Sequence, residues 1–328
     1  MSAVGQTTSA CGKVILLGEH AVVYGVPALC GALARGVEVQ IVPGQGRLCV
    51  PAWDVVTPGA VALRSDPAVA AASISLSQAY AAILASLPAG CDGAVADVDF
   101  VATFSLPTGA GLGSSAALAV ALVRAIGLCL SGRLGRGLSL AEVDAAAFAA
   151  ERVFHGQPSG LDHTVAQHGG FGLFRRGQGL SPIADLPAMS AGGGLRLCIG
   201  HTGRARDTKG RVARVAELYA QDRAGTQARF DRIAALVEEA VAALRRGDLA
   251  ALGAAMNENQ AQLGGLDVSC PEIESMCHLA TAAGALGCKL TGGGGGGCVV
   301  ALAPGREDAV AAAWARAGFT SFHVEVGR

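Results

Sequence analysis

Several residue classes are scarce in this sequence, and each scarcity excludes a class of protein. Aromatic residues make up 4% of the chain, charged residues make up 16%, and the formal net charge is −1. Such a composition offers no basic surface for nucleic acid. The N-terminus lacks a charged start followed by an apolar core, so no signal peptide is expected. The longest apolar run, 116–130, is interrupted by Arg124 and is too short to span a bilayer. We therefore expect a cytoplasmic protein with no nucleic acid and no membrane partner.

The ten cysteines lack the spacing of a metal site. None forms C-x-x-C, and none lies at a zinc-ligand distance from a histidine. They are scattered through apolar stretches such as Leu197-Cys198-Ile199, a pattern typical of buried thiols in a reducing compartment. We expect all ten to be free and none to be catalytic.

Apolar residues and glycine are abundant, at 51% of the chain and 47 residues respectively. The apolar content suffices for a sizeable core, and the length suits two domains. A Gly-, Pro- and Ser-rich stretch at 175–194 predicts a domain boundary, which divides the chain into 1–185 and 186–328. Hydrophobic periodicity predicts strands at 14–17, 37–42, 97–104, 195–200, 298–303 and 321–326, and helices at 66–87, 114–130, 139–154, 159–168, 271–283 and 306–317, with three or four more between 208 and 264. Four helices followed by the order β-β-α-β indicate an α+β second domain.

A first glycine-rich segment joins a predicted strand to a long predicted helix. It reads Pro107-Thr108-Gly109-Ala110-Gly111-Leu112-Gly113-Ser114-Ser115. Glycines let a ligand approach the backbone, and the helix start presents free N–H groups, so the segment is suited to bind phosphate. A tight strand–helix turn without a ligand is the alternative. The spacing excludes both the Walker A loop and the dinucleotide fingerprint.

A second glycine-rich segment consists of six consecutive glycines at 292–297, between two predicted strands. Such a run is costly in chain entropy, and an ordinary turn needs only one or two glycines. We expect a phosphate chain or a substrate to pass close to this backbone, at Gly294 and Gly295 in particular. A flexible hairpin is the alternative.

Charged residues flank these segments. Lys13 begins an apolar strand that Glu19 and His20 close, Glu151 ends a predicted helix, and Asp162 follows a Pro-Ser-Gly break. Phosphoryl transfer from ATP needs a phosphate cradle, oxygen ligands for a metal, a group that orients the acceptor hydroxyl, and a cation. The sequence contains each of these parts. Taken singly, each residue is more often solvated, salt-bridged or structural.

Four segments together resemble the motifs of the GHMP kinases, named for galactokinase, homoserine kinase, mevalonate kinase and phosphomevalonate kinase. The segment 12–25 is similar to the first family motif in its mevalonate kinase form, and 107–117 is similar to the ATP loop. The segment 289–298, K-L-T-G-G-G-G-G-G-C, is similar to the third motif. His155-Gly156-Gln157-Pro158-Ser159-Gly160-Leu161-Asp162 is similar to the stretch that carries the catalytic aspartate. The four segments occur in the family's order.

The resemblance implies a fold, a reaction and a set of roles. The fold would combine an N-terminal domain like the second domain of ribosomal protein S5 with a ferredoxin-like C-terminal domain. The reaction would be Mg²⁺-dependent phosphorylation of mevalonate by ATP, and a homodimer is compatible with it. The implied roles are base or orienter for Asp162, charge neutralisation for Lys13, nucleotide binding for 107–115, Mg²⁺ ligation for Ser115 and Glu151, and substrate contact for Glu19, His20, Arg206 and Thr208.

Three positions depart from the family pattern. Cys11 stands where Pro is usual, His163 where Asn or Pro often follows the aspartate, and Gly293 where Ala is usual. None of these changes removes a catalytic side chain. Galactokinase would carry Arg in place of Lys13, and homoserine kinase would lack this Lys and Asp pair. The remaining alternatives are phosphomevalonate kinase, another GHMP small-molecule kinase, and a catalytically silent member that binds a sugar or nucleotide. Intact Lys13, Ser115, Glu151 and Asp162 argue against the silent member.

Overall fold

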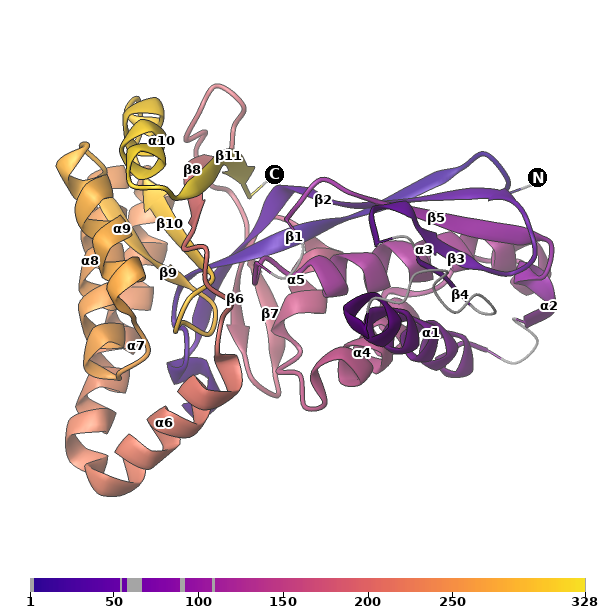
Figure 1. The fold of residues 1–328 in the computed structure, drawn as a ribbon, viewed down its shortest axis with the longest axis horizontal. Coiled ribbons are helices and arrows are strands. Elements are labelled where there is room, and N and C mark those ends of the chain that lie inside the picture. The colour runs from indigo at the N-terminus through magenta and orange to yellow at the C-terminus, as the bar shows by residue number, and fades with distance from the viewer. Residues whose placement is uncertain (1–2, 54, 58–66, 89–91, 108–109, 328) are drawn as a thin grey trace. The chain divides into compact units, whose positions relative to one another are not determined.

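The computed structural model describes residues 3–53, 55–57, 67–88, 92–107 and 110–327. The chain forms two compact units (Figure 1). Unit 1 contains Met1–Gly12, Arg35–Pro107 and Gly113–Gln167, and unit 2 contains Lys13–Ala34, Thr108–Leu112 and His168–Arg328. The strands β1 (Thr7–Leu17) and β2 (Ala28–Pro43) each contribute residues to both units. The first 34 residues therefore supply parts of both units.

Unit 1 consists of strands covered by apolar helices. Its second half of β2 pairs antiparallel with β5 (Val98–Phe104), and β5 pairs parallel with β3 (Leu48–Val50). The strand β4 (Val55–Thr57) and the 3₁₀ turn η2 (Pro51–Trp53) complete this edge. The helices are α1 (Pro67–Ser86), α2 (Asp92–Val95), α3 (Ser114–Leu134), α4 (Leu140–His155) and α5 (Leu161–His168). Alternating strand residues and helix faces meet in one hydrophobic core.

The helices α3 and α4 begin where the sequence predicts. The side chain of Ser139 accepts a hydrogen bond from the backbone N–H of Glu142, and the Glu142 carboxylate accepts one from the backbone N–H of Ser139, which completes the capping box. The helix α3 follows Gly113, whose φ of 76° suits glycine. Among the described residues, its segment Ser114–Ser131 is the single stretch long and apolar enough to cross a membrane, and 67% of it is buried in the structure. The run 116–130 is thus part of a longer helix, and its apolar character is that of a core helix.

Four strands of unit 2 pair antiparallel in the order β11-β8-β10-β9, and β11 also pairs with β2 at Val326 and Leu33. These are β8 (Leu195–His201), β9 (Gly287–Thr291), β10 (Cys298–Leu302) and β11 (Thr320–Val326). Numbered along the chain, the spatial order is 4-1-3-2, the ferredoxin-like arrangement. The helices α6 (Thr208–Gln221), α7 (Arg223–Arg246), α8 (Leu249–Gly265), α9 (Pro271–Ala282) and α10 (Glu307–Arg316) bury their apolar faces in a second core with this sheet.

Unit 2 also contains a hairpin that the sequence does not predict. The strands β6 (Phe171–Arg175) and β7 (Gly179–Ile183) pair with each other, and β6 pairs with the first half of β2. No residue of β7 is buried, so the strand lacks the alternation on which strand prediction depends. The short 3₁₀ turn η1 (Ala21–Tyr24) follows β1 in this unit.

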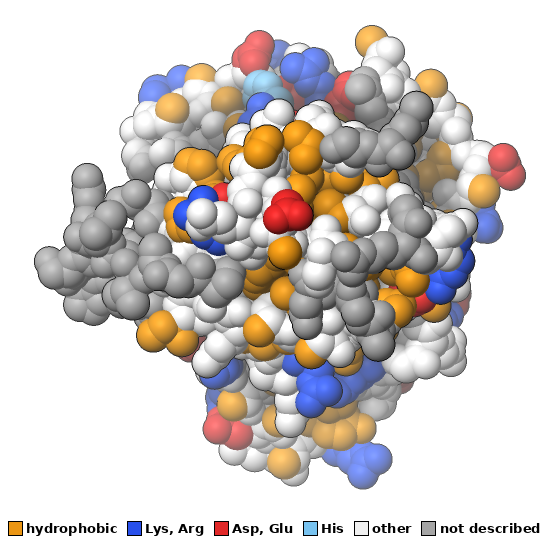
Figure 2. Space-filling view, turned by 90° about the vertical axis from the view of Figure 1, so that its right-hand side faces the viewer, with side chains coloured by type: hydrophobic (Ala, Val, Ile, Leu, Met, Phe, Trp, Pro, Cys, Tyr) orange, Lys and Arg blue, Asp and Glu red, His pale blue; other side chains and the backbone are white. Residues whose placement is uncertain are grey.

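The expected α+β class is confirmed, and the nine described cysteines are free. Cys91 lies outside the described residues. On the face of the molecule seen in Figure 2, the described Lys and Arg side chains are spread among apolar and acidic ones and do not gather into one basic surface.

Candidate active site

The described part of the first glycine-rich segment lies where the sequence places it, before α3. Ala110 and Leu112 are buried, and Gly111 has a φ of 84°, which favours glycine. The backbone N–H of Lys13 donates a 2.8 Å hydrogen bond to the carbonyl of Leu112, so the lysine and this segment are neighbours within unit 2. Lys13 is 3% exposed. Gly109 lies outside the described residues, while Pro107, Gly113, Ser114 and Ser115 belong to unit 1.

The two predicted metal ligands lie close together in unit 1. The Nε2 atom of His155 is 3.2 Å from the Ser115 hydroxyl and 3.6 Å from a carboxylate oxygen of Glu151. The Glu151 side chain is 1% exposed. A hydroxyl and a carboxylate are oxygen ligands of the kind that Mg²⁺ prefers, with substrate phosphates and water completing its shell. The donor set therefore fits Mg²⁺ held together with a nucleotide. His155 was not predicted from the sequence to belong to this group.

Asp162 lies in the first turn of α5 in unit 1, half-buried. Its neighbour His163 is 3% exposed and forms a 3.2 Å contact through Nε2 with a carboxylate oxygen of Asp144 on α4. Burial lowers the pKa of His163, and the charges of Asp144 and Asp162 oppose that shift. The contact between His163 and Asp144 holds α5 against α4, and the Asp162 carboxylate remains partly exposed. A carboxylate in such a position can accept a proton. Asp162 and Lys13 belong to different units, so their joint action remains a prediction.

The second glycine-rich segment needs its glycines. Five of the six residues at 292–297 have positive φ values, and Gly293 is the exception. At Gly293 the obstacle is packing, because an added Cβ would lie 2.4 Å from the Thr208 hydroxyl oxygen. At Gly294 it would lie 2.1 Å from the carbonyl oxygen of Val268. The backbone of this loop is therefore packed against the start of α6, which carries Thr208.

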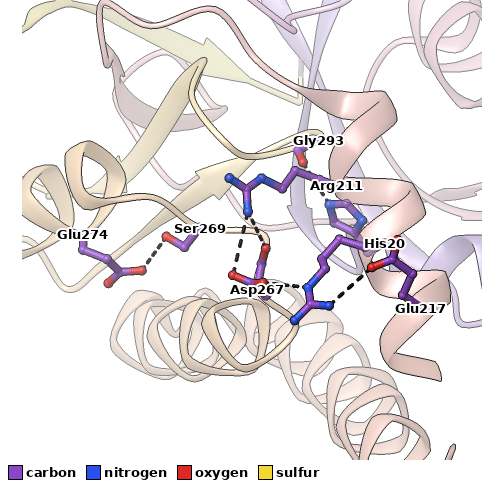
Figure 3. Close-up of polar contacts among 8 residues, drawn as sticks. His20, Arg211, Glu217, Asp267, Ser269, Glu274 and Gly293 are labelled. Carbon is purple, nitrogen blue, oxygen red and sulfur yellow. Dashed lines mark hydrogen bonds and ion pairs between the residues drawn. The ribbon is translucent and has the colours of Figure 1, made fainter. Parts of the chain in front are cut away.

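His20 joins β1 to this loop. Its backbone φ is 60°, a strained value for a residue with a side chain. Its Nε2 lies 3.1 Å from the carbonyl oxygen of Gly293 (Figure 3). Burial lowers the pKa of His20 to about 4, against a hydrogen bond that favours its charged form, and the nearby charge of Arg211 lowers it further. The imidazole is therefore neutral near pH 7, and because a carbonyl only accepts, Nε2 donates and Nδ1 is left as an acceptor.

Arg206, just before α6, and Arg211, in the first turn of α6, lie close to the glycine-rich segments. An added Cβ on Gly111 would lie 3.2 Å from the guanidinium of Arg206, and one on Gly297 would lie 3.4 Å from its Cβ. Among the described residues, Arg206 has no hydrogen-bond or ion-pair partner, so its charge is available to an anion. Arg211 donates a 2.7 Å hydrogen bond to the carbonyl of Asp267 (Figure 3). An added Cβ on Gly295 would lie 2.8 Å from the Nε atom of Arg211. Arg211 was not predicted from the sequence, although it lies about one helical turn after Thr208.

Glu19, expected to contact substrate, is buried and paired in the structure, and that contact stays a prediction. Its side chain is 1% exposed, and Lys289, at 0%, pairs with one of its oxygens. Asn259 donates a 3.3 Å hydrogen bond to the other oxygen. Burial raises the pKa of Glu19, and the charge of Lys289 opposes that shift. The carboxylate is thus held inside unit 2, and neither Lys289 nor Asn259 was predicted from the sequence to belong to the site.

We expect Gly293→Ala to raise the KM for the phosphate acceptor by about threefold to tenfold while leaving the KM for ATP within about twofold of wild type. The backbone of Gly293 tolerates a side chain, but the new methyl group must displace Thr208. Steady-state kinetics with each substrate varied in turn measures both constants. Gly305→Ala, in an open turn with a φ of 71°, is a control for the loss of a glycine. Equal changes in both KM values would contradict the placement of Thr208 at the acceptor site.

Family models match both halves of the chain. The one described as GHMP kinases N terminal domain matches residues 75–170, and the one described as GHMP kinases C terminal matches residues 240–320. The mevalonate kinase of Pyrococcus horikoshii is 36% identical over 332 residues, which cover 98% of this chain and 95% of that protein. The mevalonate kinase of Aeropyrum pernix is 36% identical over 297 residues, which cover 90% of this chain and 87% of that protein.

Solved structures agree with these sequence matches. The crystal structure of L. major mevalonate kinase in complex with R-mevalonate superposes with a TM-score of 0.79 at 30% identity, covering 98% of this chain and 96% of that one. Both glycine loops and all four resemblance segments lie within the matched length. The chain therefore belongs to the GHMP kinases and, within them, to the mevalonate kinase family.

Proposed function

We propose that this protein transfers the γ-phosphoryl group of ATP to the primary hydroxyl of mevalonate and so forms 5-phosphomevalonate in the mevalonate route to isoprenoids. The observation that carries the proposal is the acceptor site of unit 2, where neutral His20, Arg206 and Thr208 surround the glycine loop. Mevalonate offers a carboxylate to a guanidinium and hydroxyl groups to a neutral imidazole. The 30% identical L. major enzyme, whose structure holds R-mevalonate, supports this choice.

The roles of the catalytic residues follow from their chemistry. Asp162 accepts the proton of the acceptor hydroxyl as the new O–P bond forms, and the Lys13 ammonium stabilises the negative charge on that oxygen and on the phosphoryl group. The half-buried position of Asp162 and the 3% exposure of Lys13 support these roles. The backbone of 107–113 and the N-terminus of α3 bind the phosphates of ATP, and Gly294 and Gly295 line the acceptor.

Ser115 and Glu151 would hold Mg²⁺, which neutralises charge on the β- and γ-phosphates when it is bound. Within unit 1 the carboxylate of Glu151 supplies the charge and the Ser115 hydroxyl a neutral oxygen, both within reach of His155. Three further expectations belong to the proposal: a cytoplasmic location, a homodimer, and functional domains at 1–185 and 186–328.

A coupled ADP-release assay over mevalonate, phosphomevalonate, galactose and homoserine tests the proposal. We expect mevalonate to be turned over with the highest kcat/KM, and phosphorus NMR to place the new phosphate on the primary carbon. A preference for phosphomevalonate would overturn the proposed substrate. ATP binding without turnover of any of the four would instead identify a catalytically silent member.

A further inference from the structure

The end of β1 and the edge strand β9 are linked by side chains within unit 2. Thr291 accepts a 3.1 Å hydrogen bond from the backbone N–H of Ile15 and donates one of 3.1 Å to its carbonyl. Lys289 pairs with Glu19, and His20 contacts the carbonyl of Gly293. Three side-chain contacts thus join the first motif to the third. The contact of His20 with Gly293 is the one at the proposed acceptor site.

The strand β9 pairs with β10 along one edge, and amide side chains of α8 bind its other edge. Asn257 accepts a 2.9 Å hydrogen bond from the backbone N–H of Cys288, and Gln260 accepts one of 2.9 Å from that of Leu290. Asn259 lies between them in the sequence and donates to Glu19. The outer side of an edge strand otherwise lacks hydrogen-bond partners for its backbone. These amides therefore fix the position of β9, and with it the position at which Lys289 contacts Glu19.

The Glu19 carboxylate is buried and has a partner at each oxygen. Its side chain is 1% exposed, one oxygen faces Lys289, and the other faces Asn259. The nearby ammonium of Lys13 also favours its charged form. A buried ion pair is often no more stabilising than a pair of apolar side chains of similar size, so stability alone is a weak reason for this pair. A stronger reason is that Glu19 immediately precedes His20.

The turn that carries Glu19 and His20 is short and strained. The backbone N–H of Ala21 bonds the carbonyl of Glu19 at 2.6 Å, that of Val22 bonds the carbonyl of Gly18 at 3.1 Å, and His20 has a φ of 60°. A conformation of this kind persists only where its surroundings impose it. The anchor next to His20 in the sequence is the pair of Glu19 with Lys289.

We propose that Lys289 is a positioning residue for the acceptor substrate: by holding Glu19 inside unit 2, it fixes the imidazole of His20 against Gly293, where it meets mevalonate. This inference rests on the mevalonate kinase activity proposed above. Asn259 assists by occupying the second oxygen of Glu19. The proposed nucleotide-binding residues, 107–115, are not part of this group, so we expect Lys289 to affect the acceptor and not ATP.

Two variants separate positioning from stability. In Lys289→Met the Glu19 carboxylate stays buried without its cation, which destabilises the fold. The double variant Glu19→Gln/Lys289→Met carries neither charge of the pair, so we expect it to regain thermal stability. If Lys289 positions His20, both variants show a KM for mevalonate at least about tenfold above wild type, with the KM for ATP within about threefold. Cys288→Ala, on the same strand, is the control for a repacked β9 and should leave both KM values unchanged.

The outcomes distinguish this inference from the proposed function. If wild type does not turn over mevalonate, the proposed function fails, and the same KM comparison is made with whichever acceptor is used. If wild type is active and the KM of the double variant returns to the wild-type value together with its melting temperature, Lys289 only stabilises the fold and the inference is wrong. Asn259→Leu is a second test on a folded protein, because it leaves the ion pair in place; an unchanged acceptor KM in this variant would contradict the role of the network.

Discussion

Asp162→Asn and Lys13→Met are each expected to lower kcat by at least about a hundredfold. The acceptor is a primary alcohol, which is far too weakly acidic to ionise unaided near neutral pH. A carboxamide in place of the Asp162 carboxylate cannot accept the proton, and a thioether in place of the Lys13 ammonium cannot stabilise the developing negative charge. The affinities for ATP and mevalonate should change far less, because the proposal assigns binding of the two substrates to the glycine loops and the residues around His20. Rapid-quench measurement of a single turnover isolates the chemical step.

The double variant tests whether the two residues serve one step. Groups that act together are strongly non-additive, so the double variant should be little slower than the poorer single variant. Asp97→Asn, which removes an exposed carboxylate from unit 1, is a control for the change of charge. A purely structural role predicts a lower melting temperature with kcat per folded molecule near wild type. A loss under about tenfold in both single variants would therefore reject the catalytic assignment.

Much of the fold could be predicted because its signals are local. The capping box at Ser139 and Glu142, the alternation in β5 and the glycine before α3 are each encoded within a few residues. The order of elements indicated an α+β second domain, and the ferredoxin-like order of its strands is the one that the family resemblance implied. The hairpin of β6 and β7 could not be predicted, since β7 has no buried residue and its pairing partner supplies the missing information.

The site was predictable to the extent that motifs describe it. The four resemblance segments name the glycine loops and their charged neighbours, and the structure brings His20, Thr208 and Gly293 together in unit 2. The partner of Glu19 was not predictable, because Lys289 is 270 residues away in the sequence and a lysine in a strand is ordinarily solvent-exposed. The structure buries Glu19 and pairs it with Lys289 and Asn259, and its expected contact with substrate stays a prediction.

His155 illustrates a different reason for a missed residue. The motif H-G-x-P-S-G-x-D draws attention to its aspartate, whereas its histidine lies at the C-terminal end of α4, one turn after Glu151. That helical spacing places both side chains on one face, beside Ser115. The i, i+4 relation was visible in the sequence, but its meaning depended on where α3 begins relative to α4.

Glu151→Gln is expected to raise the Mg²⁺ concentration for half-maximal activity by about tenfold to a hundredfold and to lower kcat. The change keeps the shape of a side chain that is 1% exposed and removes the charge that a divalent cation requires. Because Ser115 and the nucleotide phosphates would remain as ligands, binding should weaken and not vanish. Mn²⁺ binding followed by electron paramagnetic resonance, with a non-hydrolysable ATP analogue, measures the metal site without turnover.

The control for this variant lies on the same helix. Glu142→Gln removes a carboxylate from the first turn of α4, so any effect of weakening that helix appears there as well. If Glu151 binds the metal, the Mn²⁺ affinity falls in Glu151→Gln and stays at the wild-type value in Glu142→Gln. If Glu151 serves only to hold His155, Mn²⁺ affinity is unchanged while the melting temperature falls. Titration curves of Glu151→Gln that coincide with those of wild type would remove Glu151 from the metal site and leave Ser115 as the protein's assigned ligand.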